Sequence, residues 1–321
     1  MKANWYLIKS GHLQKQPTFI GWEATPTGEL RGRWFDIQSA EPTELREFLA
    51  PLHLPSIILD EFLNPDQEPK FFYFERVIFA SIPVLVDESV TKVHYLAIIA
   101  QENMLATFHH GSIPAISQLA NELMGEKKIL GKNMASLFIQ IIQRLMNDNA
   151  SASKVIRDHI DKLLEANDRA PVSIDSGNST GVGRQLRTYS EVIEGQLRCI
   201  VGLKNTYNVA FEPGGSKEYL EKLVMDAEIA LRTAMRWETY LTNLRRDHRA
   251  NVQERIEKRL RILTIVVVIF VPLSLIAGVF GVNTNTLPVA ASPLGIAAVL
   301  GMIIMLALLL FWYFKQSGWF D

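Results

Sequence analysis

The sequence reads ILTIVVVIFVPLSLIAGVFGV from Ile262 to Val282, and this stretch decides the fold. It runs for 21 residues without a charged side chain, about the length that an α-helix needs to cross the hydrocarbon core of a bilayer. A second charge-free run of 21 residues extends from Leu294 to Phe314. Helices in a soluble core seldom stay apolar on every face for five turns. Both runs are therefore predicted to be transmembrane helices.

Charge is distributed unevenly along the 321 residues. Of 33 Lys and Arg and 34 Asp and Glu, only Lys315 and Asp321 lie beyond Arg261. The basic cluster Arg245 to Arg261 precedes the first span, whereas the loop 283–293 contains no basic residue. The positive-inside rule thus predicts cytoplasmic amino and carboxyl termini and an external loop. Anionic headgroups explain the basic cluster, and a net charge of −1 gives no reason to expect nucleic acid.

The residues before the spans predict a cytosolic α+β domain, 1–125, followed by a helical hairpin, 126–215. Aromatic and β-branched runs favour strands at Trp5–Lys9, Lys70–Arg76, Val77–Val86, Val93–Ala100 and Asn103–Phe108. Helices are expected at Thr43–Ala50, Pro55–Phe62, Ile113–Met124, Asn133–Asn167 and Arg184–Phe211. The turn-forming segment Arg169–Gly183 is expected to be a mobile connection between the last two.

A long stalk helix, 216–282, is predicted to continue into the first span, 262–282. Apolar positions recur in steps of three and four, as in an a/d seam, at Leu223, Ala227, Ala230, Ala234, Trp237, Leu241, Leu244 and His248. An internal bundle or identical helices from several subunits would both use such a seam. Two spans cannot enclose a water-filled path, so conduction would require several copies. The chain ends in the second span, 294–314, and a cytosolic tail, 315–321.

The outer end of the first span carries Gly278, Gly281 and Asn283. Polar backbone at membrane depth needs protein or water to satisfy it. A helix end or close packing of neighbouring helices would explain these residues. The functional alternative is a ring of Asn283 amide oxygens and Gly281 carbonyls around an axial ion, which suits Mg²⁺ because that ion gives up its waters reluctantly and prefers octahedral oxygen ligands.

These residues resemble the CorA superfamily of divalent-metal transporters, including its ZntB branch. The likeness is carried by TIVVVIFVPLSLIAGVFGVN, Thr264 to Asn283, with Gly-x-Asn after a long basic-ended helix, one short loop and a final span. It extends more weakly over the whole chain, including PKFFYFERVIFASIPVL, Pro69 to Leu85. The resemblance implies a homopentamer, CorA-like in shape, with a cytosolic funnel. The first span would line the pore and the second would face the lipid bilayer.

The resemblance also implies roles for individual residues. Gly281, Val282 and Asn283 would form the selectivity filter, with Asn283 as the metal contact. Four further residues would line the pore. Ser274 would form a polar ring, Val271 and Leu263 would form hydrophobic constrictions, and Gly278 would also face the path. Acidic sites between subunits would bind regulatory metal, and Glu221, Asp226 and Glu228 are the candidates; a solvated helix face is the alternative.

Two departures from the family pattern bear on the transported ion. Val282 replaces the methionine of Gly-Met-Asn, and the loop 284–293 has no carboxylate. These departures weaken a magnesium-specific assignment. Mg²⁺ still ranks first among the expected ions, but Zn²⁺, Co²⁺ and Ni²⁺ follow close behind. The expected function is transport of divalent metal ions in a multi-pass protein of a bacterial-type inner membrane. A membrane scaffold or regulatory protein with little or no conduction is the alternative, and proton-coupled transport ranks lower because neither span contains a group that could carry the proton.

Other features argue against catalysis. No nucleophile motif, nucleotide-binding loop or closed metal cluster is found, so no enzyme and no cofactor beyond the transported or regulatory cation is expected. The single cysteine, Cys199, is expected to be a small buried side chain. His109 and His110 should point to opposite faces of a strand, which makes them poor chelators and favours a surface or capping role.

Overall fold

The protein divides into two compact units, Met1–Leu244 and Arg245–Asp321. The structure is a computed structural model, and it describes residues 2–17, 32–63, 68–74, 77–87, 89–129, 134–169, 176–206, 217–282, 293–317 and 319. One helix, α6 (Lys217–Val282), is continuous over 66 residues and contributes to both units.

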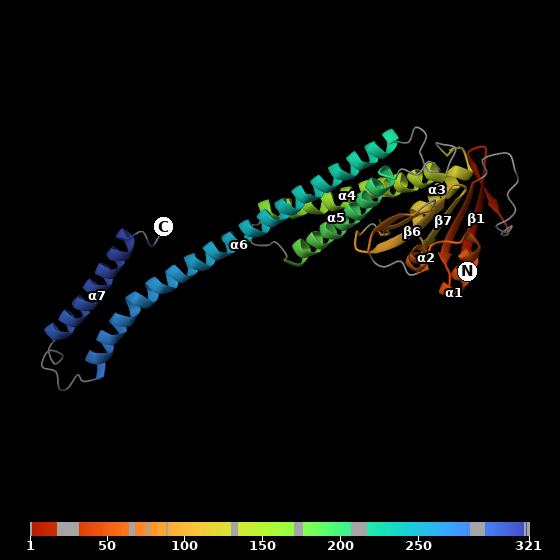
Figure 1. Cartoon of the computed structure of the whole chain (residues 1–321). Helices are drawn as coiled ribbons and strands as arrows, with labels where there is room; N and C mark the ends of the chain where they lie inside the picture. The colour runs from red at the N-terminus through yellow and green to blue at the C-terminus, as the bar shows by residue number, and fades with distance from the viewer. Residues whose placement is uncertain are drawn as a thin grey trace. The chain divides into compact units, whose positions relative to one another are not determined.

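A seven-stranded sheet lies in the first unit (Figure 1). Its strand order is β2-β1-β3-β7-β6-β5-β4. Among these strands β3 and β7 pair in parallel, and the other neighbours are antiparallel. The strands are β1 (Lys2–Lys9), β2 (His12–Gln16), β3 (Arg33–Ser39), β4 (Lys70–Phe74), β5 (Val77–Leu85), β6 (Val93–Gln101) and β7 (Met104–His109).

Helices pack on both faces of the sheet, and each face has its own hydrophobic core cluster. Leu96 and Ile98 of β6 belong to the cluster that contains α3, α4 and α5, while Ala97 and Ile99 belong to the cluster that contains α1 and α2. This alternation follows from the two-residue repeat of a strand. The helices are α1 (Pro42–Leu49), α2 (Ser56–Leu63), α3 (Pro114–Met124), α4 (Met134–Arg169) and α5 (Ser176–Lys204), with a 3₁₀ turn at Ala50–Leu52.

The seam predicted on the long helix packs inside the chain. Leu223, Ala227, Ala234, Leu241 and Leu244 of α6 are buried in the cluster that contains α4 and α5. Of the two arrangements that the periodicity allows, the internal bundle therefore accounts for the seam within the first unit.

The structure confirms the five predicted strands as β1, β4, β5, β6 and β7, and it adds β2 and β3. The expected connection Arg169–Gly183 is wrong in its second half, because α5 begins at Ser176. Ser179 and Val182 in this part are buried, and their packing outweighs the low helix propensity of the neighbouring glycines.

The second unit contains the C-terminal part of α6 and the whole of α7 (Pro293–Gln316). Within the described residues, these two helices are long and apolar enough to cross a membrane, with mean hydropathies of 2.9 and 2.5 over their most apolar windows. Only 6% of each window is buried within the chain. Their apolar side chains are therefore available to lipid or to other subunits.

Two glycines let α5 approach the sheet closely. A Cβ added at Gly195 would lie 2.6 Å from Cγ of Pro83, and one added at Gly202 would lie 2.4 Å from Cδ1 of Phe71. Ordinary side chains do not fit at such distances, so these positions fix the distance between α5 and strands β4 and β5.

We expect Gly202→Ala to destabilise the first unit by about 1–3 kcal/mol, because the added methyl overpacks the contact with Phe71. Gly181→Ala is the matched control: it lies in the same helix, and nothing lies within 4 Å of its Cβ position. The control should be neutral or stabilising by up to about 1 kcal/mol. Thermal unfolding of the purified full-length protein would measure both, and equal midpoints for the two variants would contradict the close contact.

Candidate functional site

The residues expected to line an ion path share one face of α6. Leu263, Val271, Ser274 and Gly278 are connected through Val267 by steps of three or four residues, which is the spacing of neighbours along one side of an α-helix. Leu263 and Val271 are 58% and 60% exposed, and Ser274 and Gly278 are also exposed. Apart from the backbone of its own helix, no atom of the described residues lies within 4 Å of a Cβ position at Gly278. The structure therefore places these four residues on an open strip of helix surface.

The expected filter lies at the end of this strip. Gly281 and Val282 belong to the last turn of α6, but only their backbone is described. Asn283 is the next residue in the chain and lies outside the described residues. Gly281 continues the strip, three residues after Gly278.

Hydroxyl groups are scarce on the span. Between Ile262 and Val282 the sequence contains only Thr264 and Ser274 as polar side chains. The Thr264 hydroxyl donates to the Leu260 carbonyl oxygen at 2.8 Å, so it is engaged by its own helix. Ser274 is the side-chain oxygen that the exposed strip offers, and the rest of the strip is apolar or lacks a side chain.

The stretch of α6 before the span is strongly basic. Between Arg245 and Arg261 there are seven Lys and Arg against three Asp and Glu. One of these acids, Glu254, pairs with Lys258 at 3.0 Å, and the hydrogen bond from Lys258 lowers the pKa of the Glu254 carboxyl. Positive charge is thus concentrated just before the span, whereas Asn283 follows directly after it.

The three acids expected as regulatory metal contacts are not gathered into one cluster. Glu221 pairs with Lys204 at 3.7 Å, and Glu228 pairs with Arg232 at 3.2 Å. Asp226 lines a cavity of about 360 Å³ among α4, α5 and α6, together with Lys222. Among the described residues, no group of three or more His, Cys, Asp or Glu is arranged to hold a metal ion.

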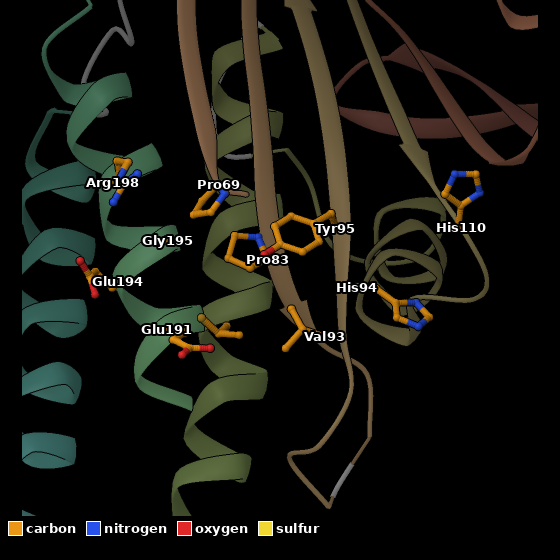
Figure 2. Close-up of a pocket in the computed structure, with 11 residues that line it drawn as sticks. Pro69, Pro83, Val93, His94, Tyr95, His110, Glu191, Glu194, Gly195 and Arg198 are labelled. Atoms are coloured by element: carbon orange, nitrogen blue, oxygen red, sulfur yellow. The ribbon is translucent and has the colours of Figure 1, made fainter. Parts of the chain in front are cut away.

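A larger cavity, of about 710 Å³, lies beside α5. Figure 2 shows Pro83 and Tyr95 between α5 and the two histidines His94 and His110. Burial, followed by the charges of Glu191 and Glu68, raises the pKa of Tyr95. The lining mixes acidic, basic and apolar side chains, so its charge does not select one class of ligand.

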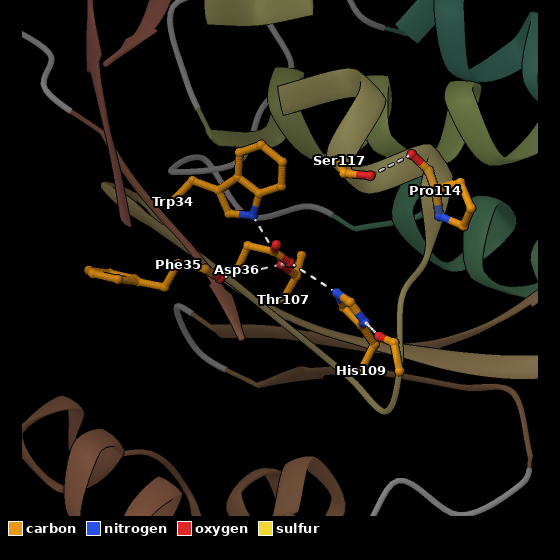
Figure 3. Close-up of polar contacts among 8 residues, drawn as sticks. Trp34, Phe35, Asp36, Thr107, His109, Pro114 and Ser117 are labelled. Atoms are coloured by element: carbon orange, nitrogen blue, oxygen red, sulfur yellow. Dashed lines mark hydrogen bonds and ion pairs between the residues drawn. The ribbon is translucent and has the colours of Figure 1, made fainter. Parts of the chain in front are cut away.

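A buried polar network links the two parallel strands (Figure 3). Trp34 Nε1 donates to Thr107 Oγ1 at 3.1 Å, and Thr107 Oγ1 donates to Asp36 Oδ1 at 3.0 Å. His109 Nε2 lies 3.2 Å from the same Asp36 oxygen. The expected surface role for His109 is therefore wrong: the residue is 1% exposed, and it faces a carboxylate from β3, 73 residues earlier in the chain. Nothing in the local sequence signals that pairing.

Cys199 lies where the sequence predicts, in the core. Its Sγ is 3.6 Å from the carbonyl oxygens of Lys70 and Ser81. Burial raises the pKa of the thiol to about 12, so the side chain is a neutral packing group at physiological pH.

Known proteins share this architecture over the whole chain. The cobalt/magnesium transport protein CorA of Methanocaldococcus jannaschii is 24% identical over 297 residues, 89% of this chain and 90% of its own. The complete structure of the CorA magnesium transporter from that organism matches with a TM-score of 0.82 at 20% identity, covering 99% of each chain. The structure of the full-length CmaX protein gives a TM-score of 0.81 at 17% identity, covering 98% of this chain and 97% of its own.

One of the similar structures is that of a cytoplasmic domain alone. The ZntB cytoplasmic domain from Vibrio parahaemolyticus matches 78% of this chain and 98% of its own, with a TM-score of 0.65 at 15% identity. The full-length matches confirm the expected fold, an α/β cytoplasmic domain with a long helical stalk and two C-terminal apolar helices. The profile of the family described as CorA-like Mg²⁺ transporter protein matches residues 30–316, which include the basic end of the stalk and both charge-free spans. This chain therefore belongs to the CorA family of divalent metal ion transporters.

Proposed function

We propose that this protein carries divalent metal ions, with Mg²⁺ as the first candidate, across a bacterial-type inner membrane along a path lined by α6. The observation that carries the proposal is the exposed strip of Leu263, Val271, Ser274 and Gly278 on the charge-free last part of α6. Zn²⁺, Co²⁺ and Ni²⁺ are the other candidate ions.

Several copies must surround such a path. One chain supplies two spans, and two helices cannot enclose water. Away from its buried seam, α6 exposes Met225, Ile229 and Tyr240, which are 55%, 52% and 43% exposed. Exposed apolar side chains in a row on a long helix favour association with further protein. We therefore infer a homo-oligomer, and the family resemblance favours a pentamer.

The proposed filter uses neutral oxygens. Asn283 side chains and Gly281 carbonyls from each copy would face a cation that keeps most of its water shell, because Mg²⁺ dehydrates reluctantly. Uncharged ligands bind such an ion weakly enough for it to leave. Val282 in place of methionine and the lack of carboxylates in 284–293 leave the order of preference among divalent ions open to measurement.

The remaining residues of the strip have separate proposed roles. Leu263 and Val271 would form apolar constrictions that stop conduction by excluding water. Ser274 would supply a ring of hydroxyls between the constrictions and the filter, and Gly278 would leave the path wide. Among the regulatory candidates, Asp226 fits best because it lines a cavity, whereas Glu221 and Glu228 each have a cationic partner.

We expect purified protein in liposomes to admit a divalent ion, measured with an enclosed metal-sensitive dye. Asn283→Ala should reduce the influx about tenfold or more, since a lost ligand contact of about 1.4 kcal/mol changes a rate by that factor. Asn285→Ala is the matched control, because it removes the same amide two residues further along the loop, and it should conduct normally. No influx above empty vesicles with Mg²⁺, Zn²⁺, Co²⁺ or Ni²⁺ would favour the scaffold alternative, which the uncharged loop and Val282 motivate.

Cysteine labelling tests the proposed orientation. A membrane-impermeant maleimide should label Thr286→Cys in intact cells, and it should label Ser317→Cys only after permeabilisation. The native Cys199 should give little background, since it is buried and its thiol stays protonated. Labelling of Ser317→Cys in intact cells would reverse the orientation.

The oligomer can be weighed directly. Native mass spectrometry of the detergent-purified protein should give five times the chain mass of 36.3 kDa. Ile229→Asp places a charge among the exposed apolar residues of α6 and should shift the population towards smaller species. A monomer as the main wild-type species would remove the proposed path, because one chain cannot enclose it.

A further inference from the structure

The buried pair of His109 and Asp36 lies where the sheet connects to α3. His109 is the last residue of β7, Gly111 follows with φ 82°, and α3 begins at Pro114. His109 Nδ1 lies 2.6 Å from the Gly111 carbonyl oxygen, and its Nε2 lies 3.2 Å from Asp36 Oδ1. The imidazole therefore bridges the turn before α3 and the neighbouring strand β3.

The partners of this ring determine how many protons it needs. A carbonyl oxygen can only accept a hydrogen bond, so Nδ1 must carry a proton. The Thr107 hydroxyl can donate its single proton to Asp36 Oδ1 at 3.0 Å or to the Phe35 carbonyl oxygen at 3.3 Å, and it accepts from Trp34 Nε1. An ionised Asp36 can only accept as well, so Nε2 must also donate. A neutral imidazole with an ionised Asp36 would leave two acceptors facing each other.

Burial makes this proton count consequential. The relative exposure of Asp36 is 3%, and that of His109 is 1%. A single charge in such a place is costly, whereas two opposite charges joined by a hydrogen bond compensate each other in part. Loss of one proton from the ring would leave the Asp36 carboxylate buried with one donor fewer.

We propose that Asp36 and His109 form a buried carboxylate–imidazolium pair that acts as a proton-dependent latch, holding the Gly111 turn and the start of α3 to β3, and that alkaline pH releases it. The latch is a property of the cytosolic unit and does not depend on the proposed ion path. By linkage, a proton that the folded state keeps and the unfolded chain releases near pH 6.5 stabilises the fold fully below that pH. The stabilisation is lost as the pH rises until the folded protein also releases the proton.

The groups that face the pair from the sheet lie on β1 and β6. On β1, burial followed by the charge of Asp36 raises the pKa of Tyr6 to about 12, so the phenol stays neutral in the range tested. On β6, the His94 ring packs against Gly111, with Cε1 3.3 Å from its Cβ position. Its Nδ1 is buried without a hydrogen-bond partner in the described chain.

Two charged groups on the neighbouring helices α3 and α4 are paired with each other. Glu122 of α3 and Arg144 of α4 form an ion pair with each other at 3.0 Å. The Ser117 hydroxyl of α3 donates to the Pro114 carbonyl oxygen at 3.0 Å. His110 contacts Phe108, with ring centroids 5.0 Å apart, and it provides a titratable neighbour that does not touch Asp36.

The first experiment follows the thermal midpoint of the full-length protein from pH 6 to pH 9.5. The wild-type midpoint should fall as the pH rises, and His109→Gln should remove that slope because its amide does not titrate. His110→Gln is the matched control and should keep the wild-type slope. Asp36→Asn should lower the midpoint by about 5 °C or more at pH 7, since it leaves an imidazolium buried without its partner. Equal slopes for wild type and His109→Gln would overturn the latch.

A second measurement does not depend on how well the variants fold. Solid-state nitrogen NMR of the wild-type protein labelled at histidine reports each ring nitrogen, and the pair predicts an imidazolium with both nitrogens protonated at pH 8, where an ordinary imidazole is neutral. The imidazolium resonances are assigned to His109 if they are missing from the spectrum of His109→Gln. If that variant does not fold, variants of His110 and of the remaining histidines assign these resonances by elimination. A neutral ring at pH 8 and no imidazolium among the seven histidines would overturn the proposal.

Discussion

Most of the apolar surface of the two spans, at the end of α6 and on α7, is left uncovered by the described part of the chain. Phe270 and Leu275 of α6 are 62% and 68% exposed, and Leu308 of α7 is 63% exposed. In water such surfaces would drive aggregation. Contact with lipid removes the drive to aggregate for most of the surface. The strip that contains Ser274 and Gly278 has small side chains, and it is the part best suited to face water or other copies. The membrane location follows from this one constraint, and the proposed assembly of several subunits would cover a further part of the same surface.

The parts of the fold that the sequence predicts are those with local signals. Charge-free length identifies the spans, and recurring apolar residues identify the seam through Leu223 and Leu241, because both patterns can be read within one helix. The expectations of a transporter rather than an enzyme and of CorA-family membership are confirmed by the family match over residues 30–316. The Asn283 filter stays a prediction, since that residue lies outside the described chain.

The parts that the sequence does not predict depend on distant partners. β3 has the charged Asp36 at its centre, which conceals a strand that pairs in parallel with β7. His109 resembles a surface residue until that pairing supplies its carboxylate. The first turns of α5 contain several glycines, which favour a loop locally, and only the burial of Val182 shows why they are helical. Tertiary contacts override the local preference in each case.

The distribution of charge limits how the spans could move an ion. From Ile262 to Phe314 the sequence has no Asp, Glu, His, Lys or Arg, so a coupled proton would find no carrier of the usual kind in the membrane. Selection must then rely on amide, hydroxyl and backbone oxygens, which discriminate by geometry and by the hydration of the ion more than by charge. The nearest fixed charges on α6, at Arg259 and Arg261, are positive and would repel a cation. A divalent ion would therefore pass this end of the path most easily while its own water shell still screens it.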